Sequence, residues 1–293
     1  GTRDPLLDDT RRLEKALAFR GLTDRAFTAL VRYGQRAPAT PKASEGRSPQ
    51  GPFELTAPKA ELEVGLKYLV MLPVDYHPSQ RRPLLLALHG MNADASAAMQ
   101  LWATAALKRG WIVAALECVI GKGKGYMSTP DERGLGLRTV ADCMRRFAVD
   151  PSRVYVAGHS MGGHMTWDLA LTYPDRFAAA APFTGCVNGV SSNYVPNSFH
   201  VPLYCVSGER DAQITKGNRL VNEDLKRQKR PMIYVEYVGR GHEGFGEEIP
   251  KVIEWMAGKA KPRFPKDVDF VSADMETSQC CWLGMTDNQT KKQ

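Results

Sequence analysis

An alternation of short apolar runs with helical stretches begins near residue 52 and limits the fold more than any other feature of the chain. The runs PLLLALHG, WIVAALECV, RVYVAG and VPLYCVSG are almost continuously apolar, which is typical of strands buried on both faces. Stretches with helical spacing, such as ASAAMQLWATAALKRG, separate these runs. The alternation predicts an α/β fold, with a mostly parallel central sheet covered by helices on both faces.

Three segments follow from where this alternation starts and stops. Residues 1–51 are predicted to hold short helices over 5–33 and then a linker rich in Pro, Ser and Gly. Residues 52–262 form the predicted α/β domain, which opens with an antiparallel strand pair, FELTAP and GLKYLVMLP. Residues 263–293 break the pattern, and two short strand candidates there, DVDFVSA and CCWLGMT, predict an appended β-hairpin.

The charges and cysteines argue against several classes of protein. The net charge is +7, but Lys and Arg are scattered rather than gathered into a basic stripe with aromatics, so no nucleic-acid partner is expected. No apolar run approaches the roughly 20 residues that a membrane-spanning helix needs. The six cysteines include no CxxC pair and no zinc-like Cys/His spacing, so no metal is predicted and their pairing stays open. A secreted or periplasmic location is the expectation for the compartment.

The stretch VYVAGHSMGGHM carries a G-x-S-x-G pattern between a predicted strand and a predicted helix. That context is typical of a nucleophile elbow, a sharp turn that exposes a serine at the end of a strand. Glycines flank Ser160 because larger side chains would collide with the turn. The positive end of the following helix favours negative charge that develops beside the serine. The pattern predicts Ser160 as a nucleophile; the alternative is a glycine-rich turn with a bystander serine.

A serine hydroxyl needs a base, and His242 is the predicted one. It lies in VGRGHEGF, after the last predicted strand of the domain, and loops at the carboxyl ends of parallel strands collect the site in such folds. The other five histidines are set aside by position: two flank the elbow, two precede it, and one precedes any plausible acid (His159 and His164; His77 and His89; His200). A surface-loop histidine is the alternative interpretation of His242.

The acid that orients this histidine is expected in YCVSGERDAQI, after the preceding strand. Asp211 is the preferred residue, and Glu209 stays open as the alternative. Two backbone N–H groups are expected to stabilise an oxyanion: those of Met161, directly after the serine, and of Met91, in the loop LALHGMNADA. His89 is expected to shape that loop through a hydrogen bond rather than to take part in catalysis.

These motifs resemble the α/β-hydrolase superfamily over roughly residues 52 to 260. The segments LLLALHGMN, VYVAGHSMGGHMTWDLALTYPDRFAAAAPFTG, GERDAQ and GRGHE are similar to bacterial esterases of the polyhydroxybutyrate-depolymerase, feruloyl-esterase and predicted-peptidase kind. The resemblance implies a Ser-His-Asp triad that hydrolyses carboxylic esters without a cofactor. In some larger relatives a small β domain follows the hydrolase, and the C-terminal strand candidates look like its beginning.

Four residues are expected to wall the substrate pocket: Tyr126 and Met127 after one strand, and Phe183 and Thr184 after another. The loop from Gly185 to His200 is expected to cap the site, with no long lid insertion. Such an open cleft suits a bulky, aromatic or polymeric ester. The sequence therefore predicts a serine esterase; the alternatives are a peptidase on the same triad and a non-catalytic binding module on this fold. It leaves the oligomeric state open.

Overall fold

The computed structural model describes residues 51–57, 66–117, 126, 128–230, 232–262, 266–272, 279–280 and 283–284. The chain divides into two compact units, Gly1–Lys42 and Ala43–Gln293, and every described residue belongs to the second unit. The helices and linker predicted before residue 51 lie outside the described residues, so they stay predictions.

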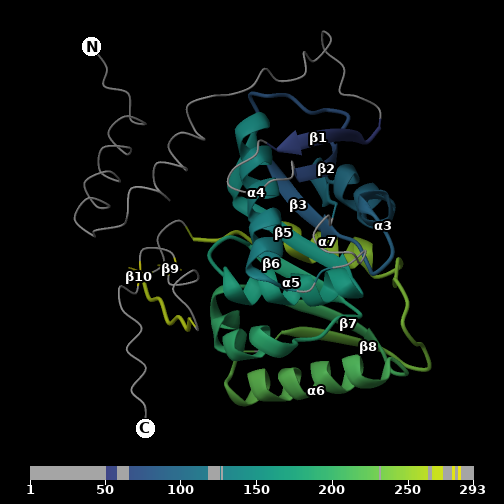
Figure 1. Cartoon of the computed structure of the whole chain (residues 1–293), viewed down its shortest axis with the longest axis vertical. Coiled ribbons are helices and arrows are strands. Elements are labelled where there is room, and N and C mark those ends of the chain that lie inside the picture. The colour runs from purple at the N-terminus through teal and green to yellow at the C-terminus, as the bar shows by residue number, and fades with distance from the viewer. Residues whose placement is uncertain are drawn as a thin grey trace. The chain divides into compact units, whose positions relative to one another are not determined.

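One eight-stranded sheet forms the centre of the second unit (Figure 1). Its strands are β1 (Phe53–Ala57), β2 (Leu66–Met71), β3 (Arg82–Leu88), β4 (Ile112–Leu116), β5 (Val149–His159), β6 (Ala179–Phe183), β7 (Tyr204–Gly208) and β8 (Ile233–Tyr237). They lie side by side in the order β1-β2-β4-β3-β5-β6-β7-β8. Strand β2 runs antiparallel to both of its neighbours, and every other neighbouring pair is parallel. The mostly parallel sheet and its opening antiparallel pair are confirmed.

Helices cover both faces of this sheet. They are α3 (Ala95–Lys108), α4 (Pro130–Arg146), α5 (Met161–Thr172), α6 (Ala212–Arg227) and α7 (Ile249–Ala257). Helices α4, α5 and α6 supply buried residues to one apolar cluster, and α3 and α7 supply them to the other. In Figure 1, α4 and α5 accordingly lie in front of the sheet, with α3 and α7 behind it.

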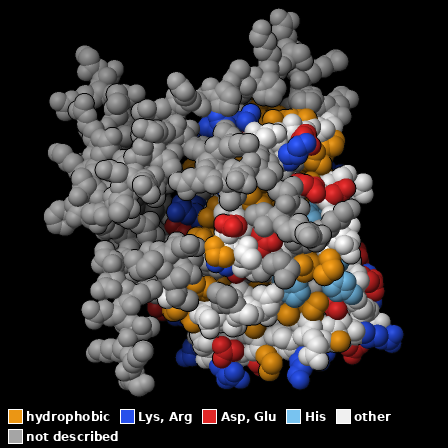
Figure 2. Space-filling view, in the orientation of Figure 1, with side chains coloured by type: hydrophobic (Ala, Val, Ile, Leu, Met, Phe, Trp, Pro, Cys, Tyr) orange, Lys and Arg blue, Asp and Glu red, His pale blue; other side chains and the backbone are white. Residues whose placement is uncertain are grey.

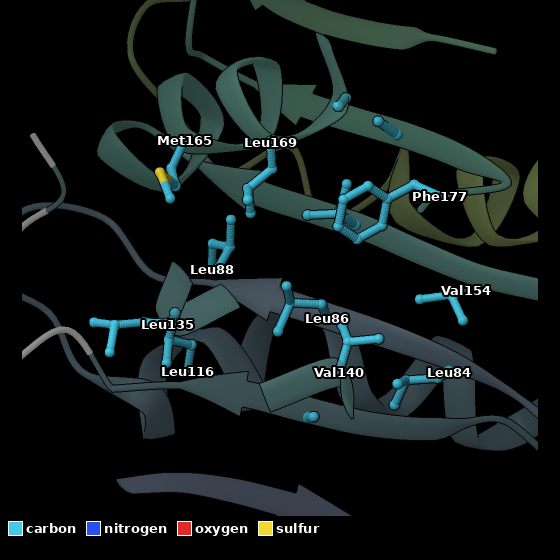
Figure 3. Packing of buried hydrophobic residues seen from close by; sticks show 14 of the residues in the cluster. Leu84, Leu86, Leu88, Leu116, Leu135, Val140, Val154, Met165, Leu169 and Phe177 are labelled. Carbon is cyan, nitrogen blue, oxygen red and sulfur yellow. The ribbon is translucent and has the colours of Figure 1, made fainter. Parts of the chain in front are cut away.

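The pleat of β3 shows how one short run supplies both cores. Successive side chains of a strand point to opposite faces, so Leu84, Leu86 and Leu88 pack on one side and Leu85 and Ala87 on the other. Figure 3 shows the first three among the leucine, valine and methionine side chains of α4 and α5. All five are fully buried, and burying one leucine contributes about 1.5–3 kcal/mol. A continuous apolar run is therefore what this position in the sheet requires.

The helix ends follow from local sequence. Thr129 and Glu132 form a capping box at the start of α4: the hydroxyl accepts from the Glu132 N–H, and the carboxylate accepts from the Thr129 N–H. Pro130 occupies the first helical position, where no N–H is needed. Gly110 follows α3 with a φ of +74°, the left-handed conformation that ends helices.

One loop prediction and one strand prediction need correction. Residues Gly189–His200, predicted as a loop, form a 3₁₀ helix, because buried Tyr194 and Asn197 fasten it to the core despite its polar composition. The described part of DVDFVSA is not a strand; the Val271 N–H instead donates to the Asn197 side chain. The small hairpin lies further along, where β9 (Gln279–Cys280) pairs antiparallel with β10 (Leu283–Gly284).

Candidate active site

The backbone at Ser160 is a sharp turn between β5 and α5. Its φ of 58° and ψ of −120° fall in a region that residues with a Cβ rarely adopt, and holding one there costs about 1–3 kcal/mol. Two glycines make the turn sterically possible. A Cβ on Gly158 would lie 2.4 Å from the Gly162 carbonyl oxygen, and one on Gly162 would lie 2.4 Å from the Leu88 oxygen. The G-x-S-x-G spacing is therefore a packing requirement of this turn.

Backbone hydrogen bonds hold the strained residue in place. The Ser160 N–H donates to the Phe183 carbonyl oxygen at 2.9 Å and lies 3.3 Å from the Thr184 hydroxyl oxygen. Thr184 is itself fully buried with a φ of 45°. The end of β6 thus fixes the serine from the neighbouring strand, and the Ser160 side chain stays free to point outward.

Three side chains from three loops form a hydrogen-bonded chain. The Nε2 atom of His242 lies 2.7 Å from Ser160 Oγ, and its Nδ1 atom lies 2.9 Å from Asp211 Oδ2. The loops follow β5, β7 and β8, three parallel strands of the sheet with β6 between β5 and β7, so their carboxyl ends lie at one edge of the sheet. The contacts fit a neutral imidazole that donates from Nδ1 to the carboxylate and accepts the serine proton at Nε2.

The two carboxylates after β7 differ in what they bind. Asp211 precedes α6 but makes no side-chain capping bond there, which leaves its carboxylate for His242. The side chain of Asp211 is 10% exposed, whereas that of His242 is 41% exposed. Glu209 accepts from the Gly239 N–H at 2.6 Å. Of the two carboxylates kept open from the sequence, Asp211 is the one that contacts the imidazole.

A pocket of about 330 Å³ opens beside Ser160. One wall is apolar and is formed by residues of α3 and of the segment before it, and the other wall carries imidazoles. The lining residues are Leu88, His89, Gly90, Met91, Ala93, Ala97, Ala98, Leu101, His159, Ser160 and His242. In Figure 2, histidine side chains reach the described surface next to hydrophobic ones. The pocket thus has the mixed character typical of a small-molecule site, with apolar walls and a few polar groups.

The two predicted oxyanion donors are the backbone N–H groups of Met161 and Met91. Met161 is the first residue of α5, so its N–H has no carbonyl partner within the helix. Met91, which directly follows Gly90 and is 58% exposed, lines the pocket. A Cβ on Gly90 would stand 3.4 Å from the Ser160 Cβ, so this loop passes close to the serine. The Nδ1 atom of His89 lies 2.7 Å from the Gly90 oxygen, in keeping with the loop-shaping role predicted for it.

The two histidines that flank the serine make other contacts. His164 lies on α5, and its Nδ1 contacts the Cys186 backbone at 2.7 Å. His159 lines the same pocket as His242, and the centroids of their two rings are 5.3 Å apart. Burial, and then the neighbouring His242 charge, lowers the pKa of His159. Its Nε2 is buried without a hydrogen-bond partner within the described residues.

Of the four residues predicted to wall the pocket, three do not line it, and the fourth, Met127, lies outside the described residues. Phe183 is fully buried and packs edge-on against Trp102, with ring centroids 4.9 Å apart. Tyr126 is 3% exposed and its hydroxyl donates to the Leu116 carbonyl, so it belongs to the core. Thr184 is buried beneath the elbow. The actual apolar wall on α3 was missed, although that helix directly follows the predicted oxyanion loop.

Two other kinds of feature are absent from the residues that the structure describes. Within these residues, no three His, Cys, Asp or Glu side chains gather in a way that could hold a metal ion. Likewise, none of the helices described is long and apolar enough to cross a membrane.

Solved structures share this architecture. A thermostable esterase superposes with a TM-score of 0.61, covering 72% of this chain and 63% of its own, at 22% identity. A fluorophosphonate-binding serine hydrolase from Staphylococcus aureus superposes with a TM-score of 0.59 at 18% identity, and the match covers 71% of this chain and 98% of that one. The chain has the α/β-hydrolase fold. The resemblance stated from the sequence motifs is confirmed at this level.

Sequence comparisons find similarity between this chain and several esterases. Residues 129–271 match the dienelactone hydrolase family. A bifunctional acetylxylan esterase/xylanase of Neocallimastix patriciarum is 33% identical over 161 residues, which cover 52% of this chain and 22% of that protein. Poly(3-hydroxyalkanoate) depolymerase C of Paucimonas lemoignei is 27% identical over 188 residues, which cover 59% of this chain and 39% of that protein. Feruloyl esterase B of Talaromyces stipitatus is 29% identical over 150 residues, which cover 50% of this chain and 36% of that protein. The matches span about a fifth to two fifths of these three relatives.

Proposed function

We propose that this α/β-hydrolase cleaves carboxylic esters through Ser160, His242 and Asp211. The observation that carries the proposal is the unbroken hydrogen-bonded chain from the Ser160 hydroxyl through both imidazole nitrogens to the Asp211 carboxylate, at 2.7 and 2.9 Å. This chain ends in a pocket with an apolar wall. The relatives named as acetylxylan and feruloyl esterases and as a polyester depolymerase give the reaction class independent support.

In the proposed first half-reaction, Ser160 Oγ attacks the ester carbonyl carbon while its proton passes to His242 Nε2. The carbonyl oxygen becomes an oxyanion and is stabilised by the N–H groups of Met91 and Met161 and by the N-terminus of α5. The tetrahedral intermediate then collapses and the C–O bond to the alcohol breaks. The alcohol leaves with the proton from His242, and the acyl group stays on Ser160.

In the second half-reaction, water takes the place of the alcohol. His242 accepts a proton from the water, which attacks the acyl carbon, and the second tetrahedral intermediate forms at the same two amides. Its collapse returns the proton to Ser160 Oγ and releases the carboxylic acid. Asp211 acts throughout by holding Nδ1–H and by stabilising the imidazolium that forms in each half-reaction.

The pocket favours an ester with an apolar acyl group of moderate size. Its volume of about 330 Å³ lies at the small end of ligand pockets, and α3 gives it an aliphatic wall. Bulky, aromatic or polymeric esters are the proposed substrates, with the alcohol part lying toward solvent. The names of the relatives, which include a feruloyl esterase and a polyhydroxyalkanoate depolymerase, agree with this range.

Hydrolysis of a graded set of esters tests the proposal. Wild-type protein is assayed on p-nitrophenyl esters of increasing chain length, feruloyl esters, acetylated sugars and polyhydroxybutyrate. Ser160→Ala and His242→Ala are expected to lower kcat at least about a thousandfold. Ser192→Ala and His77→Ala are the matched controls, because both side chains are exposed and bond only locally. Full activity in His242→Ala contradicts the assignment of the base. A folded wild type that is inert on every ester contradicts the proposal as a whole and favours a binding module.

A further inference from the structure

The segment that carries His242 has little apolar anchorage of its own. We call residues 238–245, between β8 and α7, the histidine loop. Val238 is 82% exposed, and among the loop residues only Phe245 is buried. Yet the imidazole must stay within hydrogen-bond reach of two partners, and a displacement of 1 Å can lower a rate about a hundredfold. Interactions other than core packing must therefore fix this loop.

Arg240 spans His242 within the loop. Its Nε and Nη2 both donate to Glu243 Oε2, at 2.9 and 2.6 Å, and its Nη1 pairs with Glu247. Residues 240 and 243 stand on either side of the histidine, so one side chain closes a ring across it. The guanidinium also lies over two stacked rings, 4.5 Å from the Phe245 centroid and 4.9 Å from that of Tyr237.

The backbone of Arg240 joins the histidine loop to the loop that carries the acid. Its carbonyl oxygen accepts from the Arg210 N–H at 2.8 Å, one residue before Asp211. From the same turn, Glu209 accepts from the Gly239 N–H at 2.6 Å. A Cβ on Gly208 would lie 2.2 Å from the Gly241 oxygen, so the two loops touch. Moving Arg240 would therefore shift His242 relative to both Asp211 and Ser160.

We infer that Arg240 is a positioning residue that sets the orientation of the His242 imidazole. The inference rests on the proposed function, because it assigns Arg240 a part in the same reaction. The planar guanidinium is needed as well as the charge, since it bonds a carboxylate twice while stacking on two rings, which an ammonium cannot do. Arg240 acts through the loop and takes no part in proton transfer.

The test compares Arg240→Ala and Arg240→Lys with Arg219→Ala in the full chain. Arg219 is the matched control: it binds Glu236 through both Nε and Nη2 on the surface of β8, outside the histidine loop. With p-nitrophenyl acetate, Arg240→Ala is expected to lower kcat about tenfold with KM within about twofold of wild type. Arg240→Lys is expected to recover less than half of the loss, and Arg219→Ala to match wild type.

A spectroscopic arm separates positioning from general stability. The proton on His242 Nδ1 is expected to give a downfield ¹H NMR signal in wild type and in Arg219→Ala. That signal is expected to broaden or shift in Arg240→Ala, while the melting temperature stays within about 3 °C of wild type. Unchanged kcat and an unchanged signal in Arg240→Ala overturn the inference. If wild type hydrolyses no ester, the proposed function fails, and the NMR signal still decides whether Arg240 positions the ring.

Discussion

Replacing Ser160 with glycine is expected to abolish activity and yet to stabilise the protein relative to Ser160→Ala. Both variants lose the hydroxyl and its bond to His242, so their difference isolates the backbone. Alanine keeps a Cβ at φ 58° and ψ −120°, which costs about 1–3 kcal/mol, whereas glycine visits this region freely. Glycine also makes the unfolded chain more flexible, at a cost of about 0.5–1 kcal/mol.

The difference between these terms leaves Ser160→Gly more stable than Ser160→Ala by up to about 2.5 kcal/mol. For a domain of this size, about 1 kcal/mol corresponds to about 2–4 °C in melting temperature. Urea unfolding followed by circular dichroism measures the free energy, and calorimetry checks the melting temperature. If Ser160→Gly unfolds more easily than Ser160→Ala, the strain assigned to the elbow is absent and the reasoning is refuted.

Four further predictions test other parts of the site and core. Asp211→Asn is expected to lower kcat by about 10⁴ and Glu209→Gln by less than tenfold in ester hydrolysis, since only Asp211 contacts the imidazole. Thr184→Val is expected to lower kcat about threefold to tenfold by removing an acceptor from the Ser160 N–H, and Thr184→Ser to restore it; steady-state kinetics decides. Phe183→Ala is expected to lower the free energy of unfolding by about 3–5 kcal/mol without changing acyl-chain preference, since its ring lies in the core. Burial raises the pKa of Asp168 to about 6, although the charge of Arg133 opposes the shift, so the stability that Asp168 contributes is full below about pH 4 and is lost as the pH rises through 6. Urea unfolding is expected to show that the stability advantage of wild type over Asp168→Asn falls between about pH 4 and 6. An advantage that does not change with pH contradicts this prediction.

The sequence was sufficient to predict the parts of this molecule that local patterns determine. Apolar runs are required in a sheet covered on both faces, and the elbow needs its glycines, so β3, β5 and Ser160 could be found from residues alone. His242 could be assigned as the partner of Ser160 from chain order and from the meeting of parallel strand ends, with Asp211 preferred over Glu209 as the acid. The apolar runs and the elbow rest on steric rules that act over a few residues, and the partner assignment rests on a topological rule that joins distant loops.

The errors arose where tertiary packing decides. A strand alternates its side chains, so an uncertainty of one residue at the end of β6 leaves open whether Phe183 faces a pocket or the core. Asn, Ser and Pro made Gly189–His200 resemble a loop, yet buried contacts of Tyr194 hold it as a 3₁₀ helix. The contacts of Arg240 with Glu247 and two aromatic rings depend on where α7 begins relative to β8, which no local pattern gives.

Labelling of the folded protein with a fluorophosphonate probe tests the central claim most directly. The account predicts that one equivalent of probe attaches to Ser160, identified by mass spectrometry of the peptide that contains the elbow. It also predicts that labelling is lost in Ser160→Ala and strongly slowed in His242→Ala, because the serine is then without its base. Labelling of a different serine, or equally fast labelling of Ser160 without His242, would contradict the account.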